Sequence, residues 1–277
     1  MAVRLCAFAD EASNMIDGQI AAMKRNGIEL LEIRGVDGEN IKDITLDKAK
    51  EVRKKLDDAG LSVWSMGSPI GKIKTDDDLD AHIEDHKRIM EYADILGTKR
   101  IRMFSFLNFK ENPLSWEEFE AKAFPMMQKL CDATPADFIL CHENEKRIFG
   151  ENPENCIKLL REFPKLRAVF DPANFVQCGV DTLKAWDMLK SYVDYMHIKD
   201  ANAQGKVVPA GYGIGNVGEI VKMYLAQGGE VMTLEPHLNS FVGLDKLEDG
   251  ESLETAFSYK NNDESFDAAV KALRAII

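Results

Sequence analysis

Short apolar runs alternate along the chain with longer runs in which apolar positions recur at helical spacing. The short runs are typical of buried strands, and the longer ones of helices that pack one face against a sheet. The predicted strands span residues 3–9, 30–34, 61–67, 100–105, 138–143, 168–171, 195–198 and 231–235. The predicted helices span residues 15–26, 47–59, 79–96, 116–131, 153–162, 181–190, 217–227 and 264–276.

The ends of the helical runs carry the residues that such ends favour. Several runs begin after a side chain that can accept a hydrogen bond from the first turn, and several end at a glycine. The predicted caps are Asn14, Thr45, Ser115 and Asn152, and the glycines are Gly27, Gly60, Gly97 and Gly228. An alternation of strand and helix predicts parallel strands joined by right-handed crossovers.

Eight strand–helix units in 277 residues fit one closed (β/α)₈ barrel, so we predict a single α/β TIM-barrel domain over residues 1–277. An open doubly wound sheet is the alternative, but it favours a glycine-rich turn after the first strand, and FADEAS is not one. The segment of about 237–263 is long for a loop after the last strand. We expect it to lie over the C-terminal mouth of the barrel as a candidate lid.

Charge and cysteine content indicate which partners the protein binds and whether its thiols are reduced. Lys plus Arg is 35 and Asp plus Glu is 47, and the net charge of -12 disfavours binding to nucleic acid or to an anionic membrane. Five cysteines without a CxxC spacing favour reduced thiols over disulfides or a cysteine-bound zinc. With no signal-peptide pattern and no apolar run that spans a bilayer, a cytoplasmic protein is expected.

Metal-binding residue types stand at the ends of four consecutive predicted strands. These residues are Glu143, Asp171, His197 and Glu235. Strand ends converge at the catalytic face of such a barrel, so the four side chains are expected to meet there. Three carboxylates and one imidazole suit Mn²⁺, Mg²⁺ or Co²⁺, while zinc remains an alternative. Taken singly, each acid could instead be a helix cap or a surface residue.

Neighbouring positions supply candidates for substrate binding. Because side chains alternate along a strand, Lys199 shares a face with His197, and His237 shares one with Glu235. Arg34 ends the second strand on the same face as Glu32, and we favour an ion pair between these two over a contact of Arg34 with substrate. A further candidate, Lys72, lies in a loop.

The loop candidate Lys72, in SPIGK, fits substrate binding and plain solvation equally well. Two other motifs have structural interpretations. His82 and His86 do not match a zinc motif and lie on an outer helix. The glycines at 213, 215 and 218 spell GxGxxG, but no strand leads into them, so we favour a plain loop over a phosphate site.

Segments along nearly the whole chain carry a resemblance to a known family. They are FADEAS, LEIRGVDGENI, SMGSPIGK, CHENE, FDPANF, MHIKDA, PAGYGIG and TLEPHL. The chain resembles the sugar phosphate isomerase/epimerase family, the xylose-isomerase-like TIM barrels. The resemblance implies a (β/α)₈ barrel and a metal bound by Glu143, Asp171, His197 and Glu235. It also implies that Glu145 and Asn174, where many members carry histidine, face the substrate.

A mechanism follows from these residues. A metal that bridges a carbonyl oxygen and a neighbouring hydroxyl stabilises the enediolate formed when the intervening C–H is lost. Glu143 and Glu235 are the candidate acid/base pair, as in the ketose 3-epimerases that the sequence resembles, and His142 is a candidate second base. The expected activity is isomerisation or epimerisation of a small sugar, sugar phosphate or polyol in carbohydrate metabolism.

Three other functions are alternatives to this activity. The same metal chemistry could drive a lyase or hydrolase that acts on an oxidised sugar or glycoside, and a non-catalytic barrel is a further alternative. An endonuclease-IV-like repair enzyme is disfavoured because only five histidines occur and the chain is acidic. The sequence leaves open a homo-oligomer and a partner subunit.

Overall fold

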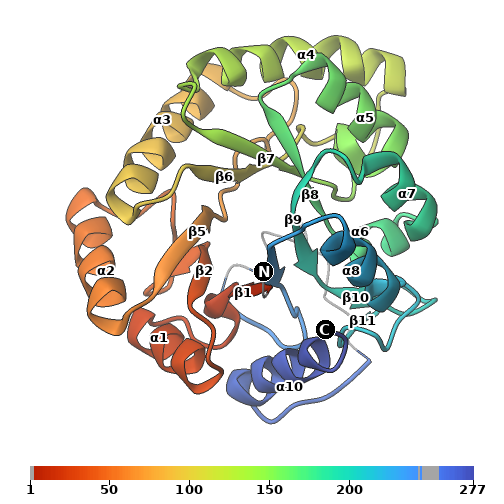
Figure 1. Ribbon diagram of the computed structural model, residues 1–277. Helices are drawn as coiled ribbons and strands as arrows, with labels where there is room; N and C mark the ends of the chain where they lie inside the picture. The colour runs from red at the N-terminus through yellow and green to blue at the C-terminus, as the bar shows by residue number, and fades with distance from the viewer. Residues whose placement is uncertain (1–2, 243, 245–255) are drawn as a thin grey trace.

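The computed structural model describes residues 3–242, 244 and 256–277, and within these residues eight parallel strands close into a barrel (Figure 1). The first strand pairs with both the second and the last, which completes the closure. The predicted α/β barrel is confirmed, and the closed order excludes the open doubly wound sheet. The strands are β1 (Arg4–Ala7), β2 (Leu30–Ile33), β5 (Ser62–Met66), β6 (Arg100–Met103), β7 (Ile139–Glu143), β8 (Leu166–Phe170), β9 (Val193–Ile198) and β12 (Val231–Leu234).

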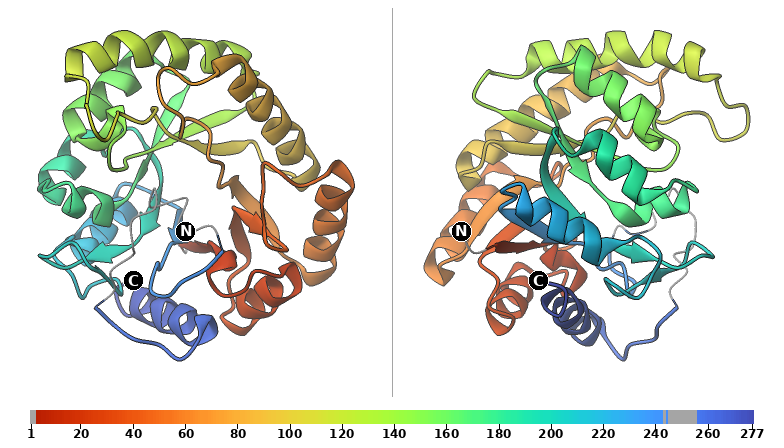
Figure 2. Two further views of the ribbon diagram at one scale, coloured as in Figure 1. Left: turned by 180° about the vertical axis from the view of Figure 1, so that it is seen from behind. Right: turned by 45° about the vertical axis from the view of Figure 1, so that its right-hand side comes forward.

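Helices form a ring outside the strands (Figures 1 and 2). The ring closes where the first and last helices meet, and there Arg25 lies 2.6 Å from Asp263 and 2.9 Å from Asp267. The outer helices are α1 (Ile16–Arg25), α2 (Leu46–Ala59), α3 (Leu79–Leu96), α4 (Trp116–Ala133), α5 (Pro153–Glu162), α7 (Thr182–Leu189), α8 (Val217–Ala226) and α10 (Asn262–Arg274).

Smaller elements that the sequence pattern did not predict follow several strands. A short helix, α6, comes directly after β8, and two hairpins extend the loops after β2 and β9. The elements are η1 (Ala9–Glu11), η2 (Phe149–Glu151), α6 (Pro172–Gln177), and the hairpins β3 (Gly35–Val36) with β4 (Glu39–Asn40) and β10 (Asp200–Ala201) with β11 (Val207–Val208). They lengthen the loops that carry polar residues of the site.

Three predicted helix caps are confirmed, because the side chains of Thr45, Ser115 and Asn152 accept hydrogen bonds from the first turns. The cap predicted at Asn14 is wrong. Helix α1 begins after Met15, and the carboxylate of Asp37, in the β3–β4 turn, accepts a hydrogen bond of 2.8 Å from the amide of Ile16. A residue distant in sequence therefore caps this helix.

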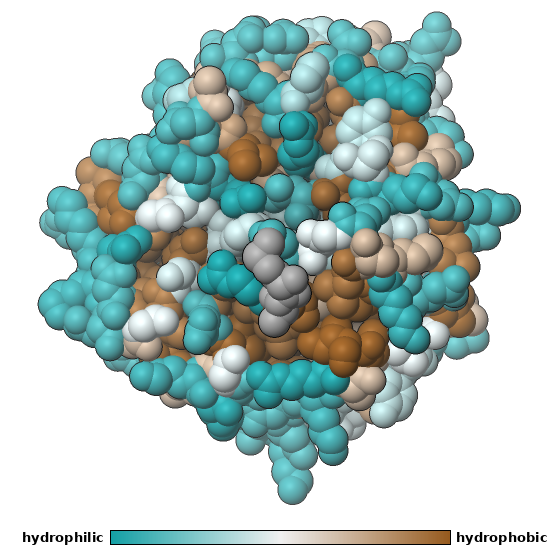
Figure 3. Space-filling view, in the orientation of Figure 1, coloured by the Kyte–Doolittle hydropathy of each residue, from teal (hydrophilic) through white to brown (hydrophobic). Residues whose placement is uncertain are grey.

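Apolar residues fill the space between the barrel and its helices, and a smaller cluster that includes Cys6, Cys141 and Tyr195 fills the barrel interior. On the face seen in Figure 3, hydrophilic residues dominate the outer rim and apolar residues show between the helices. Among the described residues no helix is long and apolar enough to cross a membrane. Much of the predicted loop at 237–263 lies outside the described residues.

Candidate metal centre

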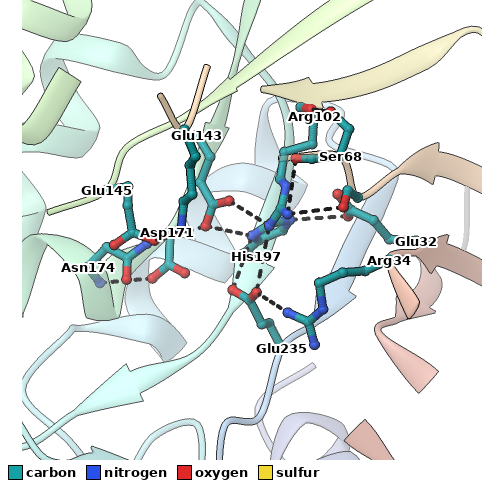
Figure 4. Close-up of polar contacts among 12 residues, drawn as sticks. Glu32, Arg34, Ser68, Arg102, Glu143, Glu145, Asp171, Asn174, His197 and Glu235 are labelled. Atoms are coloured by element: carbon teal, nitrogen blue, oxygen red, sulfur yellow. Dashed lines mark hydrogen bonds and ion pairs between the residues drawn. The ribbon is translucent and has the colours of Figure 1, made fainter. Parts of the chain in front are cut away.

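The four predicted metal ligands meet above the barrel interior (Figure 4). Glu143 ends β7, Asp171 follows β8, His197 lies near the end of β9, and Glu235 follows β12. One ligand atom from each side chain lies within 4.8 Å of the others, and none of the four residues is more than 2% exposed. Parallel strands thus bring together four residues that are up to 92 positions apart in the sequence, from 143 to 235.

His197 lies at the centre of the carboxylates. Its Nδ1 is 3.0 Å from Oε1 of Glu143 and 3.3 Å from Oε2 of Glu235, while its Nε2 is 3.1 Å from Oε2 of Glu32. Burial disfavours a charged imidazole, but the charges of Glu143, Glu32 and Glu235 outweigh burial and raise the pKa of His197 well above its usual value. The imidazole therefore behaves as one cation among several anions.

Asp171 presents one oxygen to the cluster. Its Oδ1 accepts a hydrogen bond of 2.9 Å from the amide of Asn174 and so caps α6. Its Oδ2 is buried and lies 3.1 Å from Nζ of Lys199, but it receives no hydrogen bond of good geometry from the described residues. Burial, opposed by Lys199 and reinforced by Glu235 and Glu143, raises the pKa of Asp171 to about 7. An unsatisfied carboxylate oxygen is what a cation ligand requires.

Glu235 is the most heavily paired acid of the four. Its Oε2 lies 3.0 Å from Nζ of Lys199, and its Oε1 accepts a hydrogen bond of 3.1 Å from Arg34. Burial would raise the pKa of Glu235, but Lys199, His237 and His197 hold it well below its usual value. Burial likewise opposes the charge of Lys199, yet Asp171 and Glu235 raise the pKa of its ammonium well above the ordinary range.

The predicted ion pair between Arg34 and Glu32 is wrong. Arg34 binds both oxygens of Asp10, at 2.9 and 3.0 Å, and Glu11 at 3.2 Å, and these two acids belong to η1. Glu32 instead turns into the barrel toward His197. Since most donors of the Arg34 guanidinium are used by protein carboxylates, its contacts are those of a structural anchor beside Glu235.

Arg102 belongs to the site although the sequence reasoning missed it. It donates a hydrogen bond of 3.1 Å to Oε2 of Glu143 and two more, of 3.2 and 3.3 Å, to the carbonyls of Gly67 and Ser68. Burial alone would raise the pKa of Glu143, but His197 and Arg102 lower it to about 2 despite the nearby Glu235. In the sequence, charged residues within the predicted strands 30–34 and 100–105 could have indicated that acids and bases line the barrel interior.

The other predicted substrate contacts lie around this cluster. The Nε2 of His237 is 3.5 Å from both Glu11 and Glu235. The amide of Asn174 donates to Oε1 of Glu143 at 3.3 Å. Lys72 and Glu145 form an ion pair of 3.3 Å.

His142 lies on the opposite face of β7 from Glu143. Its Nε2 is 2.9 Å from the hydroxyl of Ser105, which also accepts a hydrogen bond of 2.8 Å from the amide of Gly150. Burial lowers the pKa of His142 to about 4. Because strand alternation turns this ring away from the cluster, we do not retain His142 as a second base.

The weaker motifs have structural roles. Amides of Gly211, Gly213 and Gly215 each donate a hydrogen bond of 3.0 Å to the carboxylate of Asp200, so a side chain of the protein occupies the loop that could have bound phosphate. On helix α3, His82 accepts a hydrogen bond from the amide of Gly71 and His86 contacts Thr134.

The comparisons with known proteins agree with this architecture. The family described as xylose isomerase-like TIM barrel matches residues 20–274, and the chain therefore belongs to this family. The resemblance found in the sequence is thus confirmed. Among curated proteins, no sequence matches the chain.

Solved structures of several enzymes share the fold. A D-allulose 3-epimerase from Methylomonas sp., in complex with D-allulose, has a TM-score of 0.76 and 18% identity, covering 99% of this chain and 96% of that one. A probable 3-DHS dehydratase from Bacillus anthracis has a TM-score of 0.74 and 17% identity, covering 99% of each chain. A xylose isomerase-like protein from Mycobacterium smegmatis, in complex with magnesium, has a TM-score of 0.69 and 13% identity, covering 99% and 97%. At these identities the likeness concerns the fold.

Proposed function

We propose that this protein is a divalent-metal-dependent isomerase or epimerase that acts on a small sugar, sugar phosphate or polyol-type substrate. The observation that carries the proposal is the buried cluster of Glu143, Asp171, His197 and Glu235, whose ligand atoms lie within 4.8 Å of one another. Such a cluster is costly to bury unless a cation offsets the repulsion among its carboxylates.

The residues fit a metal ion. Asp171 offers an oxygen that receives no hydrogen bond from the described residues, and the donor set of three carboxylates and one imidazole favours Mn²⁺, Mg²⁺ or Co²⁺ over thiolate-bound zinc. When bound, such an ion would polarise a substrate carbonyl and offset negative charge that develops on its oxygen. Substrates of known relatives, such as D-allulose in the complex described above, carry this carbonyl beside a hydroxyl-bearing carbon.

The protein's own acids would move the proton. Glu143 is ionised, with a pKa of about 2, so it can take a proton from the carbon next to the substrate carbonyl. Glu235 faces the same Nδ1 of His197 from the neighbouring strand end, after β12, and can return a proton to that carbon. The ammonium of Lys199, 3.0 Å from Oε2 of Glu235, keeps Glu235 ionised before the reaction. The proton that Glu235 returns would therefore come from a substrate hydroxyl, and Glu143 would give its own proton to the alkoxide left behind. Return to the opposite face of the carbon gives epimerisation, and return to the neighbouring carbon gives isomerisation.

Residues around the cluster would bind the rest of the substrate. His237 and Asn174 contact Glu235 and Glu143 directly, and the pair of Lys72 and Glu145 is partly exposed in the loops after β5 and β7. These groups can donate to and accept from hydroxyl groups. Burial of the whole cluster excludes water and strengthens each electrostatic contact with the substrate.

The test is metal binding combined with isotope exchange. Mn²⁺ affinity is measured for the wild type, for Glu235→Ala and for a control, Asp194→Asn, which removes an acid that pairs with Arg100 instead. The proteins are then incubated with ketoses, aldoses and 3-oxo-sugars in deuterated water. Metal binding lost only in Glu235→Ala, with deuterium entering one carbon of a rearranged product, supports the proposal.

Two outcomes would contradict it. Metal binding together with net loss of a leaving group from the substrate would identify a lyase in place of an isomerase. Failure of both the wild type and the Asp194→Asn protein to take up Mn²⁺, Mg²⁺ or Co²⁺ would remove the metal-dependent mechanism altogether.

A further inference from the structure

We propose that Glu32 is a positioning residue that selects Nδ1 of His197 as the metal-facing nitrogen, and that Tyr195 holds Glu32 in place for this task. The inference rests on the proposed metal site. It concerns residues below the four ligands, inside the barrel.

The three side chains form a continuous line of contacts. Oε1 of Glu32 accepts a hydrogen bond of 2.8 Å from the hydroxyl of Tyr195, and Oε2 of Glu32 lies 3.1 Å from Nε2 of His197. Ser65 adds a hydroxyl 3.3 Å from that of Tyr195. Glu32 is 1% exposed, and Tyr195 and His197 are fully buried, so water cannot substitute for any of these contacts. Figure 4 shows Glu32 facing His197 from the side opposite to Glu143.

Hydrogen-bond polarity fixes which proton the imidazole keeps when a metal ion replaces the other. An ionised carboxylate only accepts hydrogen bonds, so Nε2 must carry a proton to satisfy Oε2 of Glu32. The lone pair for a metal is then on Nδ1. This nitrogen is the one that faces Glu143 at 3.0 Å and Glu235 at 3.3 Å. In neutral His197 this lone pair would point at two carboxylates, an arrangement that is stable only with a cation or a proton between them.

Packing fixes the orientation of the ring as well. The ring centroids of Phe8 and His197 lie 5.3 Å apart at an interplanar angle of 81°, and those of Tyr195 and His197 lie 5.6 Å apart. Rotating the imidazole to exchange its nitrogens would break the contact with Glu32 in this close-packed setting. Carboxylate partners of metal-bound histidines typically contribute about 10- to 100-fold in metal affinity.

The experiment compares three variants with the wild type. Glu32→Gln can turn an amide N–H toward Nε2 and so loses the selection of tautomer. Tyr195→Phe removes only the hydroxyl that holds Glu32. Asp194→Asn is the matched control on the same strand as His197. Mn²⁺ affinity is measured by titration calorimetry. The protonation of the two ring nitrogens of His197 is measured by ¹⁵N NMR in the Mg²⁺-loaded protein, a readout independent of catalysis.

We expect Glu32→Gln to lower Mn²⁺ affinity by about 10- to 100-fold, Tyr195→Phe to lower it by less, and Asp194→Asn to leave it unchanged. In the wild type, Nε2 should carry the proton and Nδ1 should show the metal-bound shift. If Glu32→Gln does not fold, the wild-type spectrum and the Tyr195→Phe titration still decide the question.

Two results would overturn the inference while leaving the proposed function intact. They are a wild-type spectrum with the metal on Nε2, and a folded Glu32→Gln protein that binds Mn²⁺ as tightly as the wild type. A wild-type protein that binds no metal would instead contradict the proposed function itself, so the two failures are distinguishable.

Discussion

The ammonium of Lys199 lies 3.1 Å from Oδ2 of Asp171, an oxygen that receives no well-formed hydrogen bond from the described residues. The same ammonium lies 3.0 Å from Glu235. A cation of the protein thus already stands between two of the proposed metal ligands. A bound metal ion and Lys199 would therefore compete for the same two carboxylates.

Replacement of Lys199 tests this competition. In Lys199→Met the two buried acids lose their shared cation, and breaking such a pair costs about 3–5 kcal/mol. We expect the metal-free variant to melt at a lower temperature than the wild type and to bind Mn²⁺ more tightly, because the metal ion then relieves the repulsion. Thermal unfolding with and without Mn²⁺ measures both effects. The control is Lys184→Met, because the side chain of Lys184 is 82% exposed. Weaker Mn²⁺ binding by Lys199→Met than by the wild type would refute the competition.

Replacement of His142 tests whether this residue has a structural or a catalytic role. In His142→Leu the contact with Ser105 is lost, and loss of a buried hydrogen bond costs about 1–3 kcal/mol. We expect a lower melting temperature with turnover retained in the folded protein. Gly150→Ala should act similarly, because a Cβ at Gly150 would lie 2.2 Å from the His142 ring. A loss of turnover at unchanged stability would return His142 to the catalytic residues.

The glycine-rich loop depends on Asp200. Its carboxylate accepts hydrogen bonds from the amides of Gly211, Gly213, Gly215 and Ala201. Asp200→Ala leaves the buried amides of Gly215 and Ala201 unsatisfied, and we expect a loss of about 2–4 kcal/mol in the free energy of unfolding. Denaturant titration measures the loss. An Asp200→Ala protein as stable as the wild type would show that water replaces the carboxylate without cost.

The cap on α1 makes a prediction about acid stability. Burial opposes ionisation of Asp37, but the amide of Ile16 and the ammonium of Lys48 lower its pKa below the ordinary value of 3.8. Because its pKa is lowered in the folded state, the ionised carboxylate of Asp37 stabilises the protein at pH values above its ordinary pKa. This contribution disappears as the pH falls through the folded-state pKa.

We therefore expect Asp37→Ala to cost about 1 kcal/mol at neutral pH, a typical value for a cap, and almost nothing at a pH below the folded-state pKa. Unfolding titrations of both proteins at the two pH values measure the difference. Asp47→Ala provides a control, because Asp47 has an exposed carboxylate near the start of α2. An equal cost at both pH values would mean that the charge of Asp37 does not contribute.

The sequence was sufficient to predict the barrel, because strand and helix periodicity is a local property that caps and glycines reinforce. It also predicted which four residues would meet, since each ends a strand. Partner choice inside the barrel was not predictable in this way. The pairing of β2 with β5 shifts register between Leu31 and Glu32. Whether Glu32 pairs with Arg34 or with His197 depends on this register shift and on the position of η1. Neither can be predicted from the spacing of residues along the chain.

The junction between β1 and β12 has a consequence for synthesis of the protein. Arg4 pairs with Val231, so the first strand leaves the ribosome long before its neighbour on that side exists. Until then one edge of β1 offers unpaired backbone groups to any other strand in reach. Nascent and truncated chains should therefore be the forms most prone to aggregate and most dependent on chaperones.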